Sequence, residues 1–170
     1  RLLDKLRQSR CDLILMPGDI IDDIKPLRGA ELFLDQVSAI APCYYCTGNH
    51  ENIETLITLP EVKARVRQAG ITVLDNTRET ITIRGTRLTL CGVDDPRKYA
   101  YIDRDQQEEV QLMNELGSMQ DCPEYTILLA HRPERSPIYA QFGFDLIVSG
   151  HAHGGQVRIP GLINGLFAPR

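Results

Sequence analysis

The segment SGHAHGG places His151 and His153 two residues apart in a run of small residues. The other two histidines of the chain also lie in short polar blocks, His50 in TGNHE and His131 in LLAHRPE. A further block, LMPGDIIDD, places Asp19 directly after a glycine. Each block follows an apolar run that is typical of a buried strand. Because ligand sites gather at the carboxyl ends of strands in open α/β sheets, we expect these blocks to meet in space.

The side chains in these blocks are of the types that bind divalent metal ions. Imidazoles, a carboxylate and the amide carbonyl of Asn49 form a ligand set suited to Mn, Fe or Zn. Asp19 carries two oxygens and can bridge two ions, while His151 and His153 can face the same side of an extended loop. A glycine precedes three of the ligands and lets the chain turn sharply beside an ion. The chemistry indicated is that of a metal cluster.

Each block taken alone also has an ordinary structural explanation. Asp19 after Gly18 is typical of a turn or a helix cap, and Glu51 could cap a helix that follows GNHE. A histidine at the end of a buried strand, such as His131, is more often a core residue than a ligand. The metal site is therefore predicted from the blocks jointly, because all of them fall at strand ends.

Short apolar runs alternate with amphipathic stretches along the chain. Buried strands are predicted at 12–18, 43–48, 125–131 and 145–150, and helices at 1–12, 29–41, 53–69 and 105–119. Residues 79–93 differ, because polar and apolar residues alternate on both sides of Arg84-Gly85, as in a β-hairpin with one-sided antiparallel strands. The predicted fold class is α/β with at least one mixed sheet, and no internal linker divides residues 1–170.

Composition disfavours several classes of protein. A net charge of -4 is unlike that of a nucleic-acid-binding protein, and no apolar run approaches the roughly 20 residues of a membrane span. The five cysteines are scattered rather than arranged as a disulfide framework. Cys43 and Cys46 lie three residues apart in a predicted strand, so their sulfurs should point to opposite faces of the sheet. We therefore expect buried thiols there and not a structural zinc or redox pair.

On these blocks the chain resembles the calcineurin-like metallophosphoesterases. The matching residues are Gly18-Asp19, Gly48-Asn49-His50-Glu51, His131 and Gly150-His151-Ala152-His153. LLAHRPE and SGHAHGGQVRIPGLINGL further resemble the bacterial membrane-associated branch, which includes phosphodiesterases similar to UDP-2,3-diacylglucosamine hydrolase. The resemblance implies a two-sheet mixed β-sandwich flanked by helices, in four αββα layers, and a hydrolase that uses two divalent metal ions, Mn, Fe or Zn.

The resemblance also implies a role for each matching residue. Asp19 would bridge the two ions, while Asn49, His131 and His151 complete one site. His153 would belong to the other site. His50 would lie near the scissile phosphate and protonate the leaving oxygen or steady the transition state.

One motif of the family has no match in the chain. CDLILMPGD contains no Asp-x-His, which supplies two further ligands to the His153 site, and a helix stands at residue 1 where that strand should come first. We therefore expect residues 1–170 to be a single domain truncated at both ends, without its N-terminal strand. The second metal site would then be incomplete.

The implied reaction is hydrolysis of a phosphodiester, pyrophosphate or phosphomonoester bond by attack of a metal-bound hydroxide. The alternative is a binding or scaffold module that keeps the fold and has little or no turnover. Implied partners are a phosphate-ester small molecule or a lipid-linked substrate, with no nucleic acid, and peripheral contact with a membrane is allowed. The expected location is the cytoplasm or a membrane surface.

Several other polar residues allow two interpretations. Asp22 and Asp23 are typical of a cap or a surface position, the alternative being orientation of metal ligands. Glu51 is expected to accept backbone hydrogen bonds rather than bind metal. Arg132 is a weak candidate for contact with the substrate phosphate and could instead be solvated. The apolar segment 160–167 is expected to pack in the core rather than meet a lipid.

Overall fold

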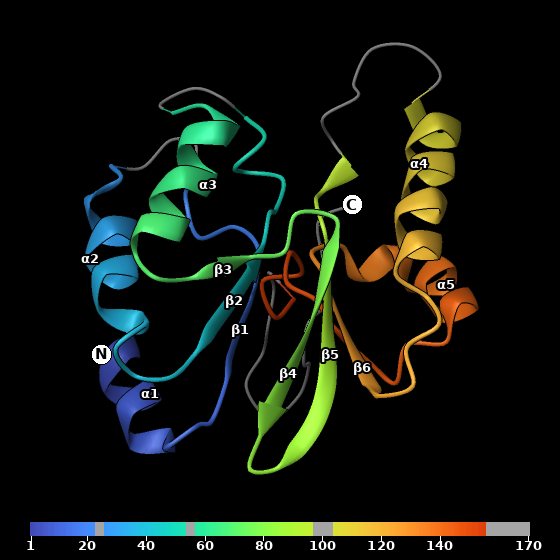
Figure 1. Cartoon of the computed structure of the whole chain (residues 1–170). Coiled ribbons are helices and arrows are strands. Elements are labelled where there is room, and N and C mark those ends of the chain that lie inside the picture. Colours follow the sequence, from blue (N-terminus) through green and yellow to red (C-terminus); the bar gives the residue numbers. More distant parts are fainter. Residues whose placement is uncertain (23–25, 54–56, 97–103, 156–170) are drawn as a thin grey trace, which may run out of the picture.

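A computed structural model of the chain describes residues 1–22, 26–53, 57–96 and 104–155. Two β-sheets pack face to face, and helices cover the outer side of each (Figure 1). Helices α1, α2 and α3 lie against the first sheet, and α4 and α5 lie against the second. The predicted α/β sandwich in αββα layers is confirmed.

The first sheet is parallel, with strand order β1-β2-β3. Its elements are α1 (Leu2–Ser9), β1 (Ile14–Pro17), α2 (Arg28–Val37), β2 (Cys43–Cys46), α3 (Leu59–Gln68) and β3 (Thr72–Val73). All four residues of β2 are buried, as expected for a strand that is covered on both faces. The start of α3 is fixed by a capping box, in which the Thr58 and Glu61 side chains and backbone pair reciprocally.

The second sheet is mixed, with strand order β4-β5-β6-β7. Its elements are β4 (Thr77–Ile83), β5 (Thr86–Val93), α4 (Arg104–Ser118), β6 (Tyr125–Ala130), η2 (Pro133–Arg135), α5 (Ser136–Tyr139), η3 (Ala140–Phe142) and β7 (Leu146–Val148). β4 and β5 form the predicted hairpin, and Arg84 and Gly85 both have positive φ, as a tight hairpin turn of type I′ requires. β5, β6 and β7 are parallel to one another.

Apolar side chains fill the space between the sheets and the space beneath each helical layer. Between the sheets lie Tyr44, Cys46, Leu74, Leu90, Ile127 and Leu129. Cys43 packs instead on the outer face with α2 and α3, so the two sulfurs of CYYC diverge as predicted. Burial raises the pKa of the Cys43 thiol to about 11 and that of Cys46 well above its ordinary value. All five cysteines are free thiols.

The predicted helices and strands are present, but several begin or end at other residues than predicted. The helix expected at 53–69 begins at Leu59, after the capping box, and residues 54–56 lie outside the described residues. β7 has three residues rather than the six of the predicted strand. The two-residue strand β3 and the single-turn helix α5 were not predicted, because segments so short carry no periodic pattern. Asp23 and the segment 160–167 lie outside the described residues.

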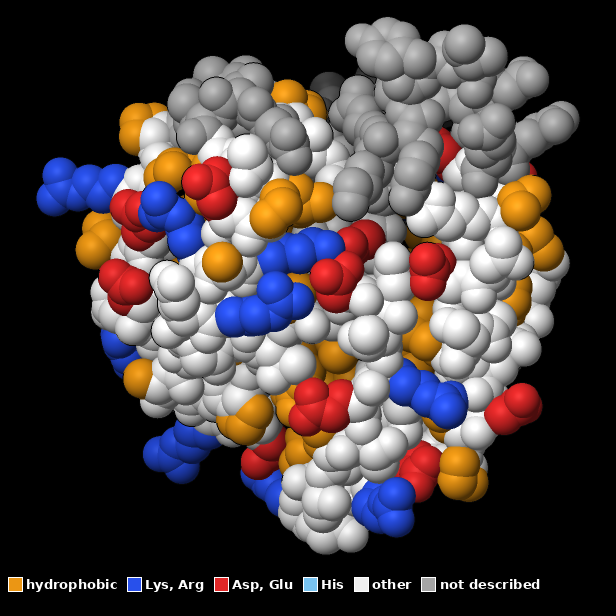
Figure 2. Space-filling model, turned by 45° about the horizontal axis from the view of Figure 1, so that its top comes forward, with side chains coloured by type: hydrophobic (Ala, Val, Ile, Leu, Met, Phe, Trp, Pro, Cys, Tyr) orange, Lys and Arg blue, Asp and Glu red, His pale blue; other side chains and the backbone are white. Residues whose placement is uncertain are grey.

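The surface carries both signs of charge. On the face shown in Figure 2, acidic and basic side chains are interspersed rather than gathered into a patch of one sign. Among the described residues, no helix combines the length and the apolar character that a bilayer crossing would need.

A buried lysine links the two halves of the sandwich. Lys63 of α3 pairs with Asp75, which follows β3, at 2.6 Å and with Asp94, which follows β5, at 2.5 Å. Burial opposes the charge of Lys63, but the two carboxylates outweigh that effect and raise its pKa. The ammonium therefore ties the helical layer of the first sheet to a strand end of the second.

Replacing Lys63 with methionine should destabilise the protein by about 2–4 kcal/mol, because Asp94, in a largely buried place, would lose its ion pair with Lys63 and keep the Thr47 hydroxyl as a donor. Urea unfolding followed by circular dichroism measures this change. The control is Lys5→Met on the exposed face of α1, which should alter stability by less than about 0.5 kcal/mol. Equal stabilities for the two variants would show that Lys63 does not join the layers.

Candidate metal centre

Side chains from four strand ends converge where the two sheets meet. Asp19 follows β1 and Asn49 follows β2, both in the first sheet. His131 directly follows β6 and His151 follows β7, both in the second sheet. The sandwich therefore brings together ligands that are up to 132 residues apart in the chain, which runs from position 19 to position 151.

The structure gathers four of the five predicted metal ligands around His131. One donor atom each of Asp19, His131 and His151 lies within 4.8 Å of the others. The Nε2 atom of His131 is 3.0 Å from Asp19 Oδ2 and 3.1 Å from Asn49 Oδ1. The rings of His131 and His151 meet edge to face, with centroids 4.9 Å apart. This arrangement offers a cation two oxygens and two imidazoles.

A backbone hydrogen bond fixes the tautomer of His131. Its Nδ1 atom is 2.7 Å from the carbonyl oxygen of Pro17, and a carbonyl can only accept, so Nδ1 carries the proton. In the neutral ring Nε2 then presents a lone pair, and it faces the acceptor oxygens of Asp19 and Asn49. Three acceptors directed at one another repel unless a cation or an additional proton lies between them. The donor set therefore fits a metal ion held by Nε2.

Further polar atoms at the site have no hydrogen-bond partner. Asp19 Oδ2 and both ring nitrogens of His151 are buried and make no hydrogen bond, although Oδ2 lies at ion-pair distance from His131. A buried polar atom left unsatisfied costs about 1–3 kcal/mol. Coordination of a cation would satisfy Asp19 Oδ2 and one ring nitrogen of His151, whose other nitrogen carries the proton of the neutral ring.

Electrostatics favour the protonation states that metal ligands need. Burial lowers the pKa of His151, and the neighbouring charges of His131 and Arg132 lower it further, so this ring is neutral at pH 7. Burial opposes the charge of Asp19, but the His131 ring in its protonated form and the backbone N–H of His50 outweigh burial, and the pKa of Asp19 is lowered. The pKa of His131 is raised by Asp19 and the Pro17 carbonyl against the effect of burial, so a proton competes there with a metal ion.

Three of the predicted ligands have unusual backbone conformations. Asp19, His151 and His153 have φ values of 55°, 56° and 48°, in the left-handed region that non-glycine residues seldom adopt. Gly18 and Gly48 allow the two loops of the first sheet to touch: a Cβ on Gly18 would lie 2.5 Å from the nitrogen of Gly48, and one on Gly48 would lie 2.3 Å from Asp19 Oδ1. Backbone strain of this kind is typical of functional sites.

The remaining predicted residues border this group. The backbone N–H of His50 donates to Asp19 Oδ1 at 3.0 Å, and its side chain is half-buried. His153 is exposed, two residues beyond His151, and lies outside the described group of side chains that can share one ion. Asp22 is half-buried. Glu51 is buried and accepts backbone hydrogen bonds, as predicted.

Arg132 is held by two carboxylates rather than solvated. Its Nε and Nη2 atoms donate to Asp95 at 2.6 and 3.3 Å, Nη1 donates to Glu134 at 3.1 Å, and the side chain is 12% exposed. Burial opposes the charge, but these carboxylates raise the pKa of Arg132. Asp95 was not predicted from the sequence, although Asp94-Asp95 follow β5 just as the other polar blocks follow their strands.

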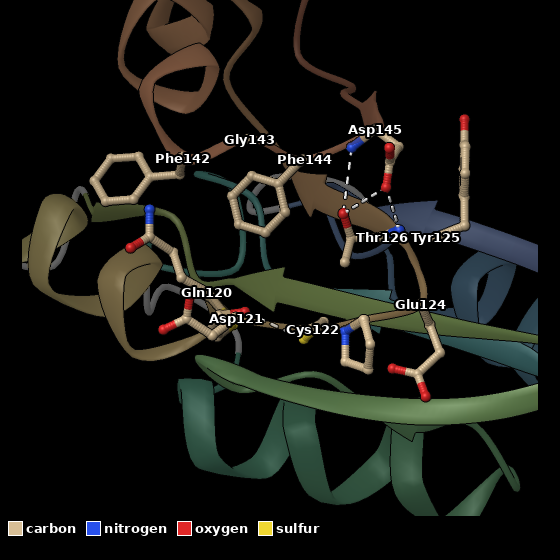
Figure 3. Close-up of a pocket in the computed structure, with 12 residues that line it drawn as sticks. Gln120, Asp121, Cys122, Glu124, Tyr125, Thr126, Phe142, Gly143, Phe144 and Asp145 are labelled. Carbon is tan, nitrogen blue, oxygen red and sulfur yellow. Dashed lines mark hydrogen bonds between the residues drawn. The ribbon is translucent and has the colours of Figure 1, made fainter.

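Two cavities flank the sandwich. One of about 610 Å³ adjoins Asp19 and Ile20 and is lined mainly by apolar side chains of α1 and α2, among them Leu2, Leu32 and Phe33. The other, of about 520 Å³, lies at the opposite end of the second sheet, around the start of β6 and the segment before β7. Figure 3 shows the Phe142 and Phe144 rings there and the hydrogen bonds between Asp145 and Thr126.

Comparison with known proteins decides the family. The family model described as Calcineurin-like phosphoesterase matches residues 1–155. The chain belongs to this family. Calcineurin-like phosphoesterases hydrolyse phosphate esters with the help of divalent metal ions, and the resemblance inferred from the strand-end blocks is thereby confirmed.

Similarity to individual members is moderate. Phosphodiesterase YaeI of Escherichia coli K12 is 30% identical over 165 residues, which are 95% of this chain and 56% of YaeI. An uncharacterized metallophosphoesterase of Helicobacter pylori J99 is 28% identical over 161 residues, which are 92% of this chain and 40% of that protein. The chain thus spans less than two thirds of the length of these relatives.

A solved structure shares the calcineurin-like phosphoesterase fold. The NAD nucleotidase NadN of Haemophilus influenzae superposes with a TM-score of 0.55 at 22% identity, over 91% of this chain and 32% of that one. At this level of identity the likeness concerns the fold of the two proteins alone.

Asp19→Asn keeps the shape of the side chain and removes its charge, and it should weaken the binding of Mn²⁺ by about 100-fold or more. Calorimetric titration of the metal-stripped protein measures the change. Asp35→Asn on the exposed face of α2 is the charge-matched control and should bind Mn²⁺ like the unaltered protein. Unchanged affinity in the Asp19 variant would exclude this carboxylate as a ligand.

Proposed function

We propose that this protein hydrolyses a phosphate ester at a metal centre formed by Asp19, Asn49, His131 and His151. The observation that carries the proposal is the Nε2 lone pair of His131, which faces two oxygen acceptors within 3.1 Å in a buried place. Only a positive charge makes that arrangement favourable, and membership of the calcineurin-like phosphoesterases supplies the reaction class.

Divalent cations supply Lewis acidity there, since they lower the pKa of water and neutralise charge that develops on the phosphoryl oxygens. The protein's own contribution is placement. The Pro17 carbonyl holds the His131 ring in one tautomer and one orientation. The lowered pKa of Asp19 and the neutral ring of His151 keep these two ligands ready for a cation, whereas at His131 a proton competes with the metal ion.

We further propose a dinuclear centre in which Asp19 is shared by two ions and His153 serves the second. The feature that supports sharing is Asp19, which directs Oδ2 to His131 and Oδ1 to the backbone of His50. His153 is assigned to the second ion from the resemblance of Gly150-His151-Ala152-His153 to the family, since its backbone is left-handed rather than extended. The mixed nitrogen and oxygen donors are suited to Mn, Fe or Zn.

His50 is our candidate for the acid that protonates the leaving oxygen. It adjoins Asn49, its backbone is bonded to Asp19, and its half-buried side chain keeps contact with solvent. Arg132 remains a candidate for contact with the substrate phosphate. Because Asp95 and Glu134 offset its charge, we expect its contribution to be smaller than that of His50.

For the substrate we favour a phosphodiester over a phosphomonoester or pyrophosphate, because YaeI, a relative at 30% identity, is named a phosphodiesterase. The apolar cavity beside Asp19 would suit an apolar organic group on a small or lipid-linked substrate. A substrate of that kind would place the protein in the cytoplasm or in peripheral contact with a membrane.

Replacing His50 with alanine should lower kcat for an aryl phosphodiester by about 100-fold or more while leaving the bound metal unchanged, since general acid catalysis typically contributes 10²–10⁴-fold. Hydrolysis is followed with added Mn²⁺, and metal content is measured on the same samples. The Asp19→Asn variant, purified identically, controls for contaminating phosphatases and should be inactive.

Two results would contradict this account in different ways. Full activity in the His50 variant would remove the acid role and leave the metal centre intact. If the unaltered protein bound metal but hydrolysed no aryl phosphodiester, phosphomonoester or pyrophosphate, it would be a binding module with the calcineurin-like fold.

A further inference from the structure

One buried carboxylate beside the candidate metal centre accepts hydrogen bonds from the backbone of two loops. Glu51 is 2% exposed, and each of its oxygens accepts two backbone hydrogen bonds. Oε1 accepts from Ile20 at 2.7 Å and Ile21 at 3.0 Å, while Oε2 accepts from Asp19 at 3.0 Å and Gly48 at 2.8 Å. Glu51 lies outside the described group of side chains that can share an ion.

The four donors come from two different loops. Three belong to the loop after β1, which carries Asp19, and the fourth belongs to the loop after β2, which carries Asn49. One side chain therefore spans the gap between the loops that bring the two oxygen ligands. The contact between the loops is tight, since neither Gly18 nor Gly48 has room for a Cβ.

The loop after β1 depends on such an acceptor. Asp19 has a φ of 55°, and the N–H groups of residues 19, 20 and 21 all point at Glu51. Successive N–H groups that converge in this way form a concavity that requires an anion. Without one, these buried donors would be unsatisfied, and the left-handed backbone that aims the Asp19 side chain would lose its support.

We propose that Glu51 is a positioning residue that sets the metal affinity of the site by holding Asp19 and Asn49 at a fixed separation before any ion binds. The inference rests on the proposed function, because it concerns the same metal centre. It assigns to the last residue of GNHE a role beyond local capping: the carboxylate acts on the ligands of a neighbouring strand through their backbone.

Glu51→Gln tests the proposal with little change of shape. Glutamine has one acceptor oxygen, so two of the four N–H donors would face its NH2 group instead. The affinity for Mn²⁺, measured by calorimetric titration of the metal-stripped variant, should fall about 10- to 100-fold. KM for an aryl phosphodiester should stay unchanged, and saturating Mn²⁺ should restore much of kcat. In the metal-free variant, the amides of Ile21 and Gly48 should exchange hydrogen faster.

The matched control is Asp145→Asn. That carboxylate also joins two segments, since its Oδ2 accepts from the N–H of Thr126 at 2.7 Å and from its hydroxyl at 3.0 Å, at the opposite end of the second sheet (Figure 3). The control should lower the urea midpoint of unfolding and leave Mn²⁺ affinity unchanged. An equal loss of affinity in both variants would overturn the proposal, because the effect would then follow stability rather than position.

The remaining outcomes distinguish a failure of the positioning role of Glu51 from a failure of the proposed function. If the unaltered protein binds Mn²⁺ and Glu51→Gln binds it equally tightly, the positioning role is wrong. If the unaltered protein binds no Mn²⁺, the proposed function fails, while hydrogen exchange at Ile21 and Gly48 still decides whether Glu51 joins the loops. Should the glutamine variant not fold, Glu51→Asp replaces it: its shorter side chain cannot reach both loops, and unchanged affinity there would refute the proposal.

Discussion

The hydrogen bond between His131 and the carbonyl of Pro17 is the contact on which the site depends. It joins the last residue of β1, in the first sheet, to the residue after β6, in the second. Because the carbonyl can only accept, the proton of the neutral ring lies on Nδ1, and Nε2 is an acceptor that faces the oxygens of Asp19 and Asn49. The packing of the two sheets therefore determines which nitrogen of His131 carries the proton. The candidate site forms only when both sheets are in place.

Buried ion pairs and hydrogen bonds hold the loops at the strand ends, which the apolar core of the sandwich does not reach. Side chains between the sheets fix their separation, but loops beyond the strand ends have no ladder to hold them. Buried charged side chains hold these segments instead. Lys63 joins α3 to the end of β5, Asp95 holds Arg132 next to His131, and Glu51 joins the loops after β1 and β2. Each charge is paired or fully hydrogen-bonded, as burial requires. The strained backbone of the ligands is sustained by this network.

The fold class and the convergence of four candidate ligands could be predicted because their signals are local: a continuous apolar run, in three cases a glycine, then a polar side chain. The Arg132–Asp95 pair could not be predicted, since its members are 37 residues apart and residues 79–93 carry the pattern of a hairpin, which drew attention away from the fifth strand end, that of β5. The tautomer of His131 depends on a contact 114 residues away, and no sequence pattern encodes it. β3 and α5 are too short to have a period, and whether His153 serves a second ion stays a prediction.

The most direct test of the central claim is a crystal structure of the protein grown with Mn²⁺, with anomalous diffraction used to locate the metal. The account predicts a peak bonded to Nε2 of His131, with Asp19, Asn49 and His151 completing the shell at about 2.0–2.3 Å, distances ordinary for nitrogen and oxygen ligands. A structure in which saturating Mn²⁺ gives no peak among these four side chains would contradict it.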